Sequence, residues 1–133
     1  DMTQSISAVT VLVPDYDQGL AFYVATLGFV LVADAPLPDG KRWVLVSPTG
    51  GQGTNLLLAK ADTPEQISAT GNQTGGRVML FLTTDDFAAD HERYLKAGVN
   101  FLELPRHEAY GTVAVFEDPF GNKWDLIQPA PAA

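Results

Sequence analysis

The sequence of 133 residues contains no cysteine, which excludes both a disulfide framework and a zinc site built on cysteine. Basic residues are scarce: 8 Lys and Arg stand against 16 Asp and Glu, and the formal net charge is −8. This imbalance argues against nucleic acid or an anionic membrane as a partner and permits a cationic ligand. No apolar run approaches the roughly 20 residues that span a bilayer, and the first residues lack the features of a signal peptide. We therefore expect a cytoplasmic protein with a single domain over residues 1–133.

The chain repeats one pattern of elements twice. In each half an apolar run, at 6–13 or 78–82, is followed by a segment with apolar residues at helical spacing. Two pairs of residues mark the expected helix ends, Asp15 with Gly28 and Asp85 with Gly98. Each aspartate stands where an N-cap would accept hydrogen bonds from free amides, and each glycine where a left-handed residue would end the helix. The aspartate and the glycine are equally far apart in both pairs, which supports the repeat.

Three further strand-like runs follow each helix. They lie at 29–34, 42–46 and 55–59 in the first half and at 101–104, 112–116 and 123–128 in the second. The turn Pro48-Thr49-Gly50 corresponds to Pro119-Phe120-Gly121. The pattern predicts two βαβββ modules at about 5–60 and 77–128. A linker over about 61–76 would contain one helical turn around 65–68, and the tail 129–133 should fray.

The most informative stretch is T-V-A-V-F-E-D-P-F-G-N-K-W-D-L-I-Q at 112–128, in which a tight turn joins two strand-like runs. Three other motifs accompany it: V-x-D at 13–15, A-F-Y…L-G-F at 21–29 and A-G-V at 97–99. Together they resemble the vicinal oxygen chelate (VOC) superfamily, the family of glyoxalase I, extradiol dioxygenases and bleomycin-resistance proteins. The resemblance covers residues 6–128. It implies an α+β fold in which two βαβββ modules form a curled eight-stranded mixed sheet around a cleft.

In metal-using members of this superfamily, four side chains hold the ion, one from the first and one from the last strand of each module. The resemblance places Ala8, Leu57 and either Val78 or Met79 at three of these positions, and Asp125 at the fourth. A divalent ion needs several nitrogen or oxygen donors, so one carboxylate is insufficient. We expect no metal and no other cofactor.

The candidate ligand-binding residues are those that the resemblance places in or around the cleft: Arg42, Trp43, Arg77, Met79, Arg106, Glu108 and Tyr110. Arg42 and Trp43 are adjacent on a strand, so only one of them can face the cleft. An arginine there could orient a carboxylate or phosphate through its guanidinium fork, while surface ion pairs are the alternative. His91 is expected to pack on the apolar face of the second helix. His107 is expected to be solvated or at the cleft rim, in a loop over 105–110.

Asp125 is the catalytic candidate. It could act as a general base or contact a cation, with its pKa raised by an apolar wall. The alternative is a carboxylate satisfied by a neighbouring arginine or by backbone amides.

Three functions follow from these observations. The first is a metal-independent protein that binds a small organic molecule, resembling the bleomycin-resistance branch. The second is an enzyme, a glyoxalase-like lyase or isomerase or a dioxygenase, with an atypical site that uses Asp125. The third is a non-catalytic interaction module. The missing metal ligands favour the first over the second. The resemblance also implies a homodimer, because small members of the family commonly associate through module edges and exposed sheet edges need cover.

Overall fold

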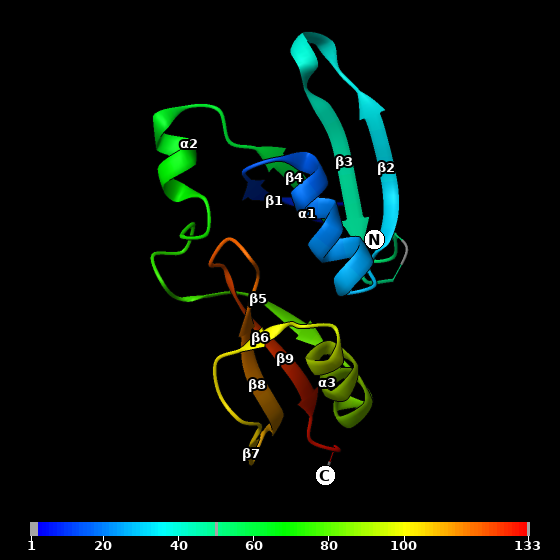
Figure 1. Cartoon of the computed structure of the whole chain (residues 1–133). Coiled ribbons are helices and arrows are strands. Elements are labelled where there is room, and N and C mark those ends of the chain that lie inside the picture. The colour runs from blue at the N-terminus through cyan, green and yellow to red at the C-terminus, as the bar shows by residue number, and fades with distance from the viewer. Residues whose placement is uncertain (1–2, 50, 133) are drawn as a thin grey trace. The chain divides into compact units, whose positions relative to one another are not determined.

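The computed structural model describes residues 3–49 and 51–132, and the chain divides into two compact units, Asp1–Thr70 and Gly71–Ala133. The first unit is a βαβββ module and the second has the same order with one additional short strand, β7, so that the described residues form two mixed sheets of four and five strands (Figure 1). This confirms the α+β fold class and adds one strand to the eight that were expected. Gly50 of the expected turn at 48–50, and Ala133 of the expected tail, lie outside the described residues. No helix in the described ranges is long and apolar enough to cross a membrane.

The first unit carries a four-stranded sheet with the order β1-β4-β3-β2. Its elements are β1 (Ala8–Val13), α1 (Tyr16–Leu20), the π-helical segment η1 (Ala21–Thr26), β2 (Val30–Pro36), the 3₁₀ turn η2 (Pro38–Gly40), β3 (Arg42–Ser47), β4 (Asn55–Lys60) and α2 (Pro64–Ala69). Strand β1 runs parallel to β4, and the other pairs are antiparallel. The helix α1 lies across one face of this sheet (Figure 1), where alternate strand residues such as Val11, Val44 and Leu58 are fully buried.

The second unit carries a five-stranded sheet with the order β5-β9-β8-β6, and β7 also pairs with β8. Its elements are β5 (Val78–Thr83), α3 (Phe87–Lys96), β6 (Asn100–Phe101), β7 (Arg106–Glu108), β8 (Gly111–Glu117) and β9 (Lys123–Pro129). In β9 the alternation is as expected: Trp124 and Leu126 are buried and Asp125 lies on the opposite face. Pro129, which the sequence assigned to the tail, is the last residue of β9.

Two predictions around β6 and β7 were wrong. The expected strand at 101–104 is limited to Asn100–Phe101, and Arg106–Glu108, expected in a loop, is the strand β7. Between them the chain leaves the sheet, and the Glu103 carboxylate accepts the hydrogen bond that the Val115 backbone N–H donates, at 2.9 Å. A strand of three residues is too short to produce a periodic signal in the sequence.

The helix ends show one confirmed and one wrong prediction. The Asp15 carboxylate caps α1, accepting hydrogen bonds from the N–H groups of Asp17 and Gln18 at 3.0 and 3.1 Å. In the second unit the N-cap is Asp86 and not Asp85, and its carboxylate accepts from the Ala89 N–H at 3.2 Å. The second N-cap differs from the prediction because the two helices are not equally long. The first contains the π-helical segment η1, and π-helical turns contain more residues than α-helical ones.

One more residue therefore separates Asp15 from Gly28 than separates Asp86 from Gly98. Matching the two helices by equal length displaced the second cap by one position. Gly28 and Gly98 themselves end the helices with φ of 83° and 87°, as predicted.

Segments next to the modules are fixed by side chains. The expected helical turn in the linker is α2, which begins with a capping box between Thr63 and Gln66. In the turn between β8 and β9, one oxygen of the buried Asp118 carboxylate accepts from the N–H groups of residues 120–122 at 2.9–3.0 Å. This turn sets the register in which β9, and with it Asp125, pairs with β8.

Candidate functional site

Asp125 lies at the centre of the second sheet, on the face that does not contact the core. Its partner across the parallel pair is Phe81 in β5, and its partner across the antiparallel pair is Val115 in β8. Residues directly opposite in neighbouring strands project from the same face. The carboxyl group is therefore flanked by two apolar side chains. One of them, Phe81, has 65% of its surface exposed.

The Asp125 carboxyl group has no local hydrogen-bond support. Its Oδ1 is buried and has no hydrogen-bond partner among the described residues. Burial raises the pKa of Asp125; the Arg106 guanidinium opposes this rise and the Glu103 carboxylate adds to it. A carboxyl group in this state suits either a proton transfer or contact with a positive group.

Arg106, Glu108 and Tyr110 form one cluster at the edge of the same sheet. The Arg106 Nε donates to Glu103 at 2.8 Å and Nη1 donates to Glu108 at 2.9 Å. Hydrogen bonds to the Glu103 carboxylate and the Tyr110 hydroxyl raise the pKa of Arg106 above its ordinary value. The guanidinium of Arg106 is thus bound to carboxylates of the chain itself. Glu103, which the sequence did not single out, also binds β8, where it accepts from the Val115 backbone N–H.

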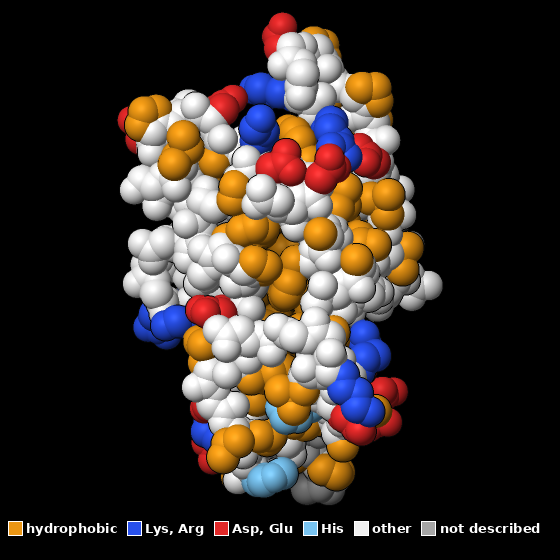
Figure 2. Space-filling view, in the orientation of Figure 1, with side chains coloured by type: hydrophobic (Ala, Val, Ile, Leu, Met, Phe, Trp, Pro, Cys, Tyr) orange, Lys and Arg blue, Asp and Glu red, His pale blue; other side chains and the backbone are white. Residues whose placement is uncertain are grey.

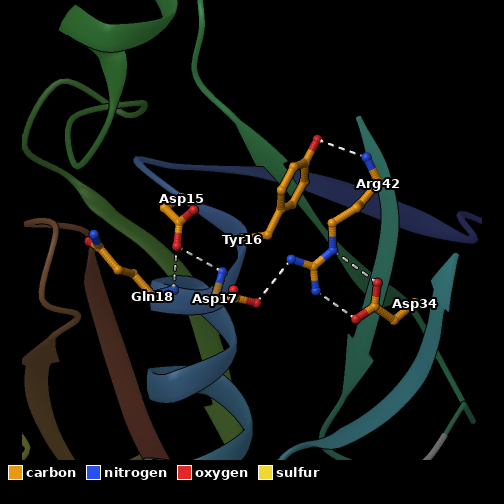
Figure 3. A network of polar contacts seen from close by, with 6 residues as sticks. All are labelled: Asp15, Tyr16, Asp17, Gln18, Asp34 and Arg42. Atoms are coloured by element: carbon orange, nitrogen blue, oxygen red, sulfur yellow. Dashed lines mark hydrogen bonds and ion pairs between the residues drawn. The ribbon is translucent and has the colours of Figure 1, made fainter. Parts of the chain in front are cut away.

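Arg42 is held in a comparable way in the first unit (Figure 3). Its Nε and Nη2 donate to the two oxygens of the Asp34 carboxylate at 3.1 and 2.7 Å, and its Nη1 donates to Asp17 at 2.9 Å. The guanidinium lies 5.2 Å from the centre of the Tyr16 ring, and the Tyr16 hydroxyl accepts from the Arg42 backbone N–H at 3.2 Å. These bonds, with that to Asp34 the largest contribution, raise the pKa of Arg42. The cluster ties the start of α1 to the β2–β3 hairpin.

Next to this cluster the first unit has a pocket of about 570 Å³. Leu12, Leu37, Trp43 and Leu57 give it an apolar wall, and Tyr16 and Arg42 also line it. Trp43 points away from the helix face of β3, since the alternate residues Val44 and Val46 are buried there, and 43% of its surface is exposed. Figure 2 shows basic, acidic and hydrophobic side chains close together at the top of the view, on the first unit.

The remaining predicted residues lie apart from these groups. Arg77 is exposed just before β5. Met79 is half-buried in β5 at an irregularity between Val78 and Leu80. This irregularity explains the two possible counterparts of Ala8. If the modules are aligned by strand pairing, Val78 corresponds to Ala8, because Val78 pairs with Lys123 in the same way that Ala8 pairs with Asn55. If they are aligned by the N-caps of the two helices, Met79 corresponds to Ala8.

The two histidines have local structural contacts. The His91 ring stacks on Phe87 with 5.4 Å between ring centres and meets the edge of Phe101 at 4.6 Å. His107 is exposed, and its Nδ1 lies 3.3 Å from the Thr112 hydroxyl.

The donor groups do not fit a divalent ion. No three His, Asp or Glu side chains come together in the part of the chain that the structure describes. In the second unit the neighbours of Asp125 across both strand pairs are apolar, and Leu57, at the same place in the first unit, lies between Thr10 and Leu45. The single carboxylate of Asp125 supplies too few donors for zinc or for a hard cation.

Sequence reasoning missed several residues that shape these sites, among them Tyr16, Asp17, Asp34, Phe81 and Glu103. Tyr16 and Asp17 lie 25 or more positions from Arg42, and no local pattern links them. Glu103 and Arg106 are three positions apart, but this spacing is a signal only on a helix.

Comparison with known proteins gives consistent matches over nearly the whole chain. The model of the Glyoxalase/Bleomycin resistance protein/Dioxygenase superfamily matches residues 5–126. An uncharacterized protein of Shewanella frigidimarina (strain NCIMB 400) is 52% identical over 128 residues, which cover 96% of this chain and 95% of that protein.

Two solved structures are similar in sequence and fold. The crystal structure of UcmS2 is 31% identical with a TM-score of 0.82, and the match covers 95% of this chain and 98% of UcmS2. That of TnmS3, an antibiotic binding protein from Streptomyces sp. CB03234, is 36% identical with a TM-score of 0.77, covering 98% of this chain and all of TnmS3, 100%.

Proposed function

We propose that this chain, which belongs to the Glyoxalase/Bleomycin resistance protein/Dioxygenase superfamily, binds a small organic molecule without the help of a metal ion. The observation that carries the proposal is the pocket of about 570 Å³ in the first unit. Its volume falls in the range of roughly 300–1,000 Å³ that is usual for small-molecule sites, and its wall combines apolar and aromatic side chains with a few polar groups.

The chemistry of the pocket suits an organic molecule with an apolar body. Trp43 and Leu37 each have 43% of their surface exposed, so a ligand could still bury apolar area on both. Arg42 is engaged by Asp34 and Asp17, and we infer that it shapes the wall instead of binding an anion. The similarity to TnmS3, described as an antibiotic binding protein, supports a role in binding an antibiotic or a related metabolite.

A thermal-shift screen of the full chain against antibiotics and metabolites tests this proposal, because a ligand that binds the native state raises Tm by mass action. For a compound that raises Tm, Trp43→Ala should weaken binding by about tenfold or more, as expected for an aromatic contact residue. Ile67→Ala is the control, since Ile67 is exposed in the same unit and does not line the pocket. The proposal fails if no compound raises Tm, or if both variants bind as the wild type does.

Metal independence is part of the proposal and has its own test. Elemental analysis of dialysed protein should find no stoichiometric divalent metal, and a chelator should leave the affinity for the ligand unchanged. About one Zn, Ni, Mn or Fe per chain, bound tightly enough to survive dialysis, would contradict it.

We also propose that the protein forms a homodimer. Strand β2 lies at one end of the first sheet and exposes Val30, Leu31 and Val32 in succession, with 48, 45 and 38% of their surfaces accessible. An apolar edge strand of this kind is normally covered by another chain or element. Sedimentation at micromolar concentration should show a dimer, and a single species of 14.3 kDa would refute it.

An enzyme is the second candidate, and the state of Asp125 favours it. A half-buried carboxyl group that has a raised pKa and one buried oxygen without a hydrogen-bond partner among the described residues is a frequent condition of a general base or acid. Product analysis after incubation with the compounds that raise Tm would separate the two candidates. Turnover that Asp125→Asn abolishes would identify an enzyme, and unchanged compounds would identify a binding protein.

A further inference from the structure

The second unit has a feature that the pocket does not account for, which is an exposed aromatic ring directly beside the unsupported carboxyl group. Phe81 and Asp125 are partners in the parallel pairing of β5 and β9. Both project from the face opposite to Trp124 and Leu126, which are buried. Phe81 has 65% of its surface exposed. A ring this exposed in the middle of a strand contributes little buried surface to the fold and is available to a ligand.

Arg106, the basic residue that lowers the pKa of Asp125, already forms ion pairs with other carboxylates. Arg106 is bound to Glu103 at 2.8 Å and to Glu108 at 2.9 Å, so its guanidinium does not neutralise Asp125 by a direct ion pair. The Asp125 Oδ1 lacks a hydrogen-bond partner among the described residues. A half-buried carboxyl group without a partner is costly, and a ligand that supplies a positive charge or a donor would offset that cost.

The charges around Asp125 leave a local excess of negative charge. Besides the Arg106 cluster, β8 and β9 place one oppositely charged pair, Glu117 and Lys123, opposite each other. Lys123 also donates to the Gly76 carbonyl oxygen at 3.2 Å. The region thus has four carboxylates, Glu103, Glu108, Glu117 and Asp125, and three basic residues, Arg77, Arg106 and Lys123. A ligand group that complements this excess is positively charged.

We propose that Asp125 and Phe81 together recognise a protonated amine of a small organic molecule that binds to the second unit. The ammonium group would donate a charge-assisted hydrogen bond to the Asp125 carboxylate while lying against the Phe81 ring. This inference rests on the proposed small-molecule function and adds a ligand class to it, organic cations. It assigns the position of the family's metal-ligating acid to an organic ammonium group.

The test compares two probes that share a phenyl ring and differ in charge, 2-phenylethylamine as the cation and 2-phenylethanol as the neutral compound. Titrations of isotope-labelled full-length protein, followed by NMR, give both the affinity and the place of binding. The amine should shift the resonances of Phe81 and Val115 and bind about fivefold or more tightly than the alcohol, the effect expected of an ion pair and a cation–π contact at a partly exposed site.

Three variants locate the source of this preference. Asp125→Asn should bind both probes equally, and Phe81→Leu should weaken binding of the amine more than that of the alcohol. Glu117→Gln is the matched control: it removes one negative charge from the adjacent strand, where Glu117 accepts a hydrogen bond from Asn100 at 2.7 Å, and it should keep the preference.

Several results would overturn the inference. These are equal affinity for the two probes in the wild type, absence of amine binding at the highest soluble concentration, or a preference that survives Asp125→Asn. If Glu117→Gln also lost the preference for the amine over the alcohol, the preference would come from the summed negative charge of the region and not from a specific contact with Asp125. A failure here is distinct from a failure of the proposed function, because the thermal-shift screen and Trp43→Ala report on the pocket in the first unit. If Asp125→Asn does not fold, the Phe81→Leu comparison still decides.

Discussion

The strands β4 and β9 occupy the same place in the two units, each between a parallel first strand and an antiparallel neighbour. Leu57 in β4 lies opposite Thr10 and Leu45, and Asp125 in β9 lies opposite Phe81 and Val115. The aspartate therefore stands in surroundings like those of the leucine, with an aliphatic side chain on the antiparallel side. Asp125 lacks hydrogen-bond support from its strand partners because neither Phe81 nor Val115 has a polar side chain.

The turns that lead into these two strands also differ. In the second unit Asp118 accepts hydrogen bonds from three successive backbone N–H groups, and Gly71 lies against the turn, with its carbonyl group close to Gly121. In the first unit the connection at 48–54 is exposed where it is described, and the Thr49 N–H donates to the Ser47 hydroxyl at 3.2 Å. The turn before β9 is thus closed by its own buried carboxylate and packed against Gly71, while the connection before β4 is held by single bonds, among them that from the Thr54 hydroxyl to the Ile6 carbonyl oxygen at 2.9 Å.

The largest effect is expected from Gly71→Ala, which tests this dependence. Gly71 has a φ of 76°, and a Cβ there would overlap the Phe120 carbonyl oxygen and come within 2.6 Å of its carbonyl carbon. The variant should lose about 3 kcal/mol or more of its free energy of unfolding, measured by urea denaturation. Gly75→Ala is the control, with a similar φ of 68° and open space at the Cβ position, and should cost about 1 kcal/mol. Equal losses in the two variants would remove the turn contact as the cause.

Leu57→Asp is expected to have the next largest effect, because it gives the first sheet the acid that the second carries. Leu57 is half-buried, and neither of its strand partners, Thr10 and Leu45, could neutralise a carboxylate introduced at this position. Loss of apolar burial and an unsupported carboxylate should destabilise the chain by about 2–3 kcal/mol at neutral pH. Denaturation at several pH values would show the loss shrinking in acid. If the variant is as stable as the wild type, the surroundings of Leu57 and Asp125 are not alike.

Asp125→Asn, unlike the two preceding variants, should leave the stability of the chain unchanged or increase it. Burial holds the pKa of Asp125 above its ordinary value of 3.8, so ionisation costs the folded state stability as the pH rises through the raised pKa. The variant cannot ionise, and its Tm should equal that of the wild type or exceed it by up to about 3 °C at neutral pH. The difference should vanish below the ordinary pKa. A marked fall in Tm at neutral pH would instead make Asp125 a structural partner within the fold.

The smallest effect is expected from Asp34→Asn in the first unit, where the carboxyl group is supported. The Arg42 guanidinium holds the pKa of Asp34 below its ordinary value of 3.8, mainly through side-chain hydrogen bonds. Asp34 therefore contributes stability above that value and loses it as the pH falls through the lowered pKa. The variant should melt about 2 °C lower at neutral pH and approach the wild type in acid. Asp39→Asn is the control, since it removes a carboxylate from the same hairpin that is not among those bound to the Arg42 guanidinium, and it should leave Tm nearly unchanged.

The repeat and the α+β class could be predicted because their signals are local. The helix-ending glycines, the caps and the alternation around Trp124 each depend on a few neighbouring residues. Other features depend on pairs far apart in the chain or on segments too short to be periodic. Three features are of this kind: the hydrogen bond from Arg42 to Asp17, the three-residue strand β7, and the Glu103 carboxylate that binds the Val115 backbone N–H in place of a neighbouring strand. The candidate site follows the same division. The alternation of Arg42 and Trp43 along the strand could be predicted from strand geometry. That both residues line one pocket, and that carboxylates bind Arg42, could not.

The π-helical segment Ala21–Thr26 has a consequence for any exchange of parts between the modules. It absorbs its extra residue inside the helix, so that the Leu27 N–H donates to the Phe22 carbonyl oxygen, five positions back, at 2.8 Å. The cap at Asp15 and the left-handed Gly28 keep their places at either end of the longer helix. A chimera that grafts α3 onto the first sheet, or the α1–η1 helix onto the second, must therefore lose or gain one residue within the helix. A graft of equal length would rotate every following helical side chain by about 100°.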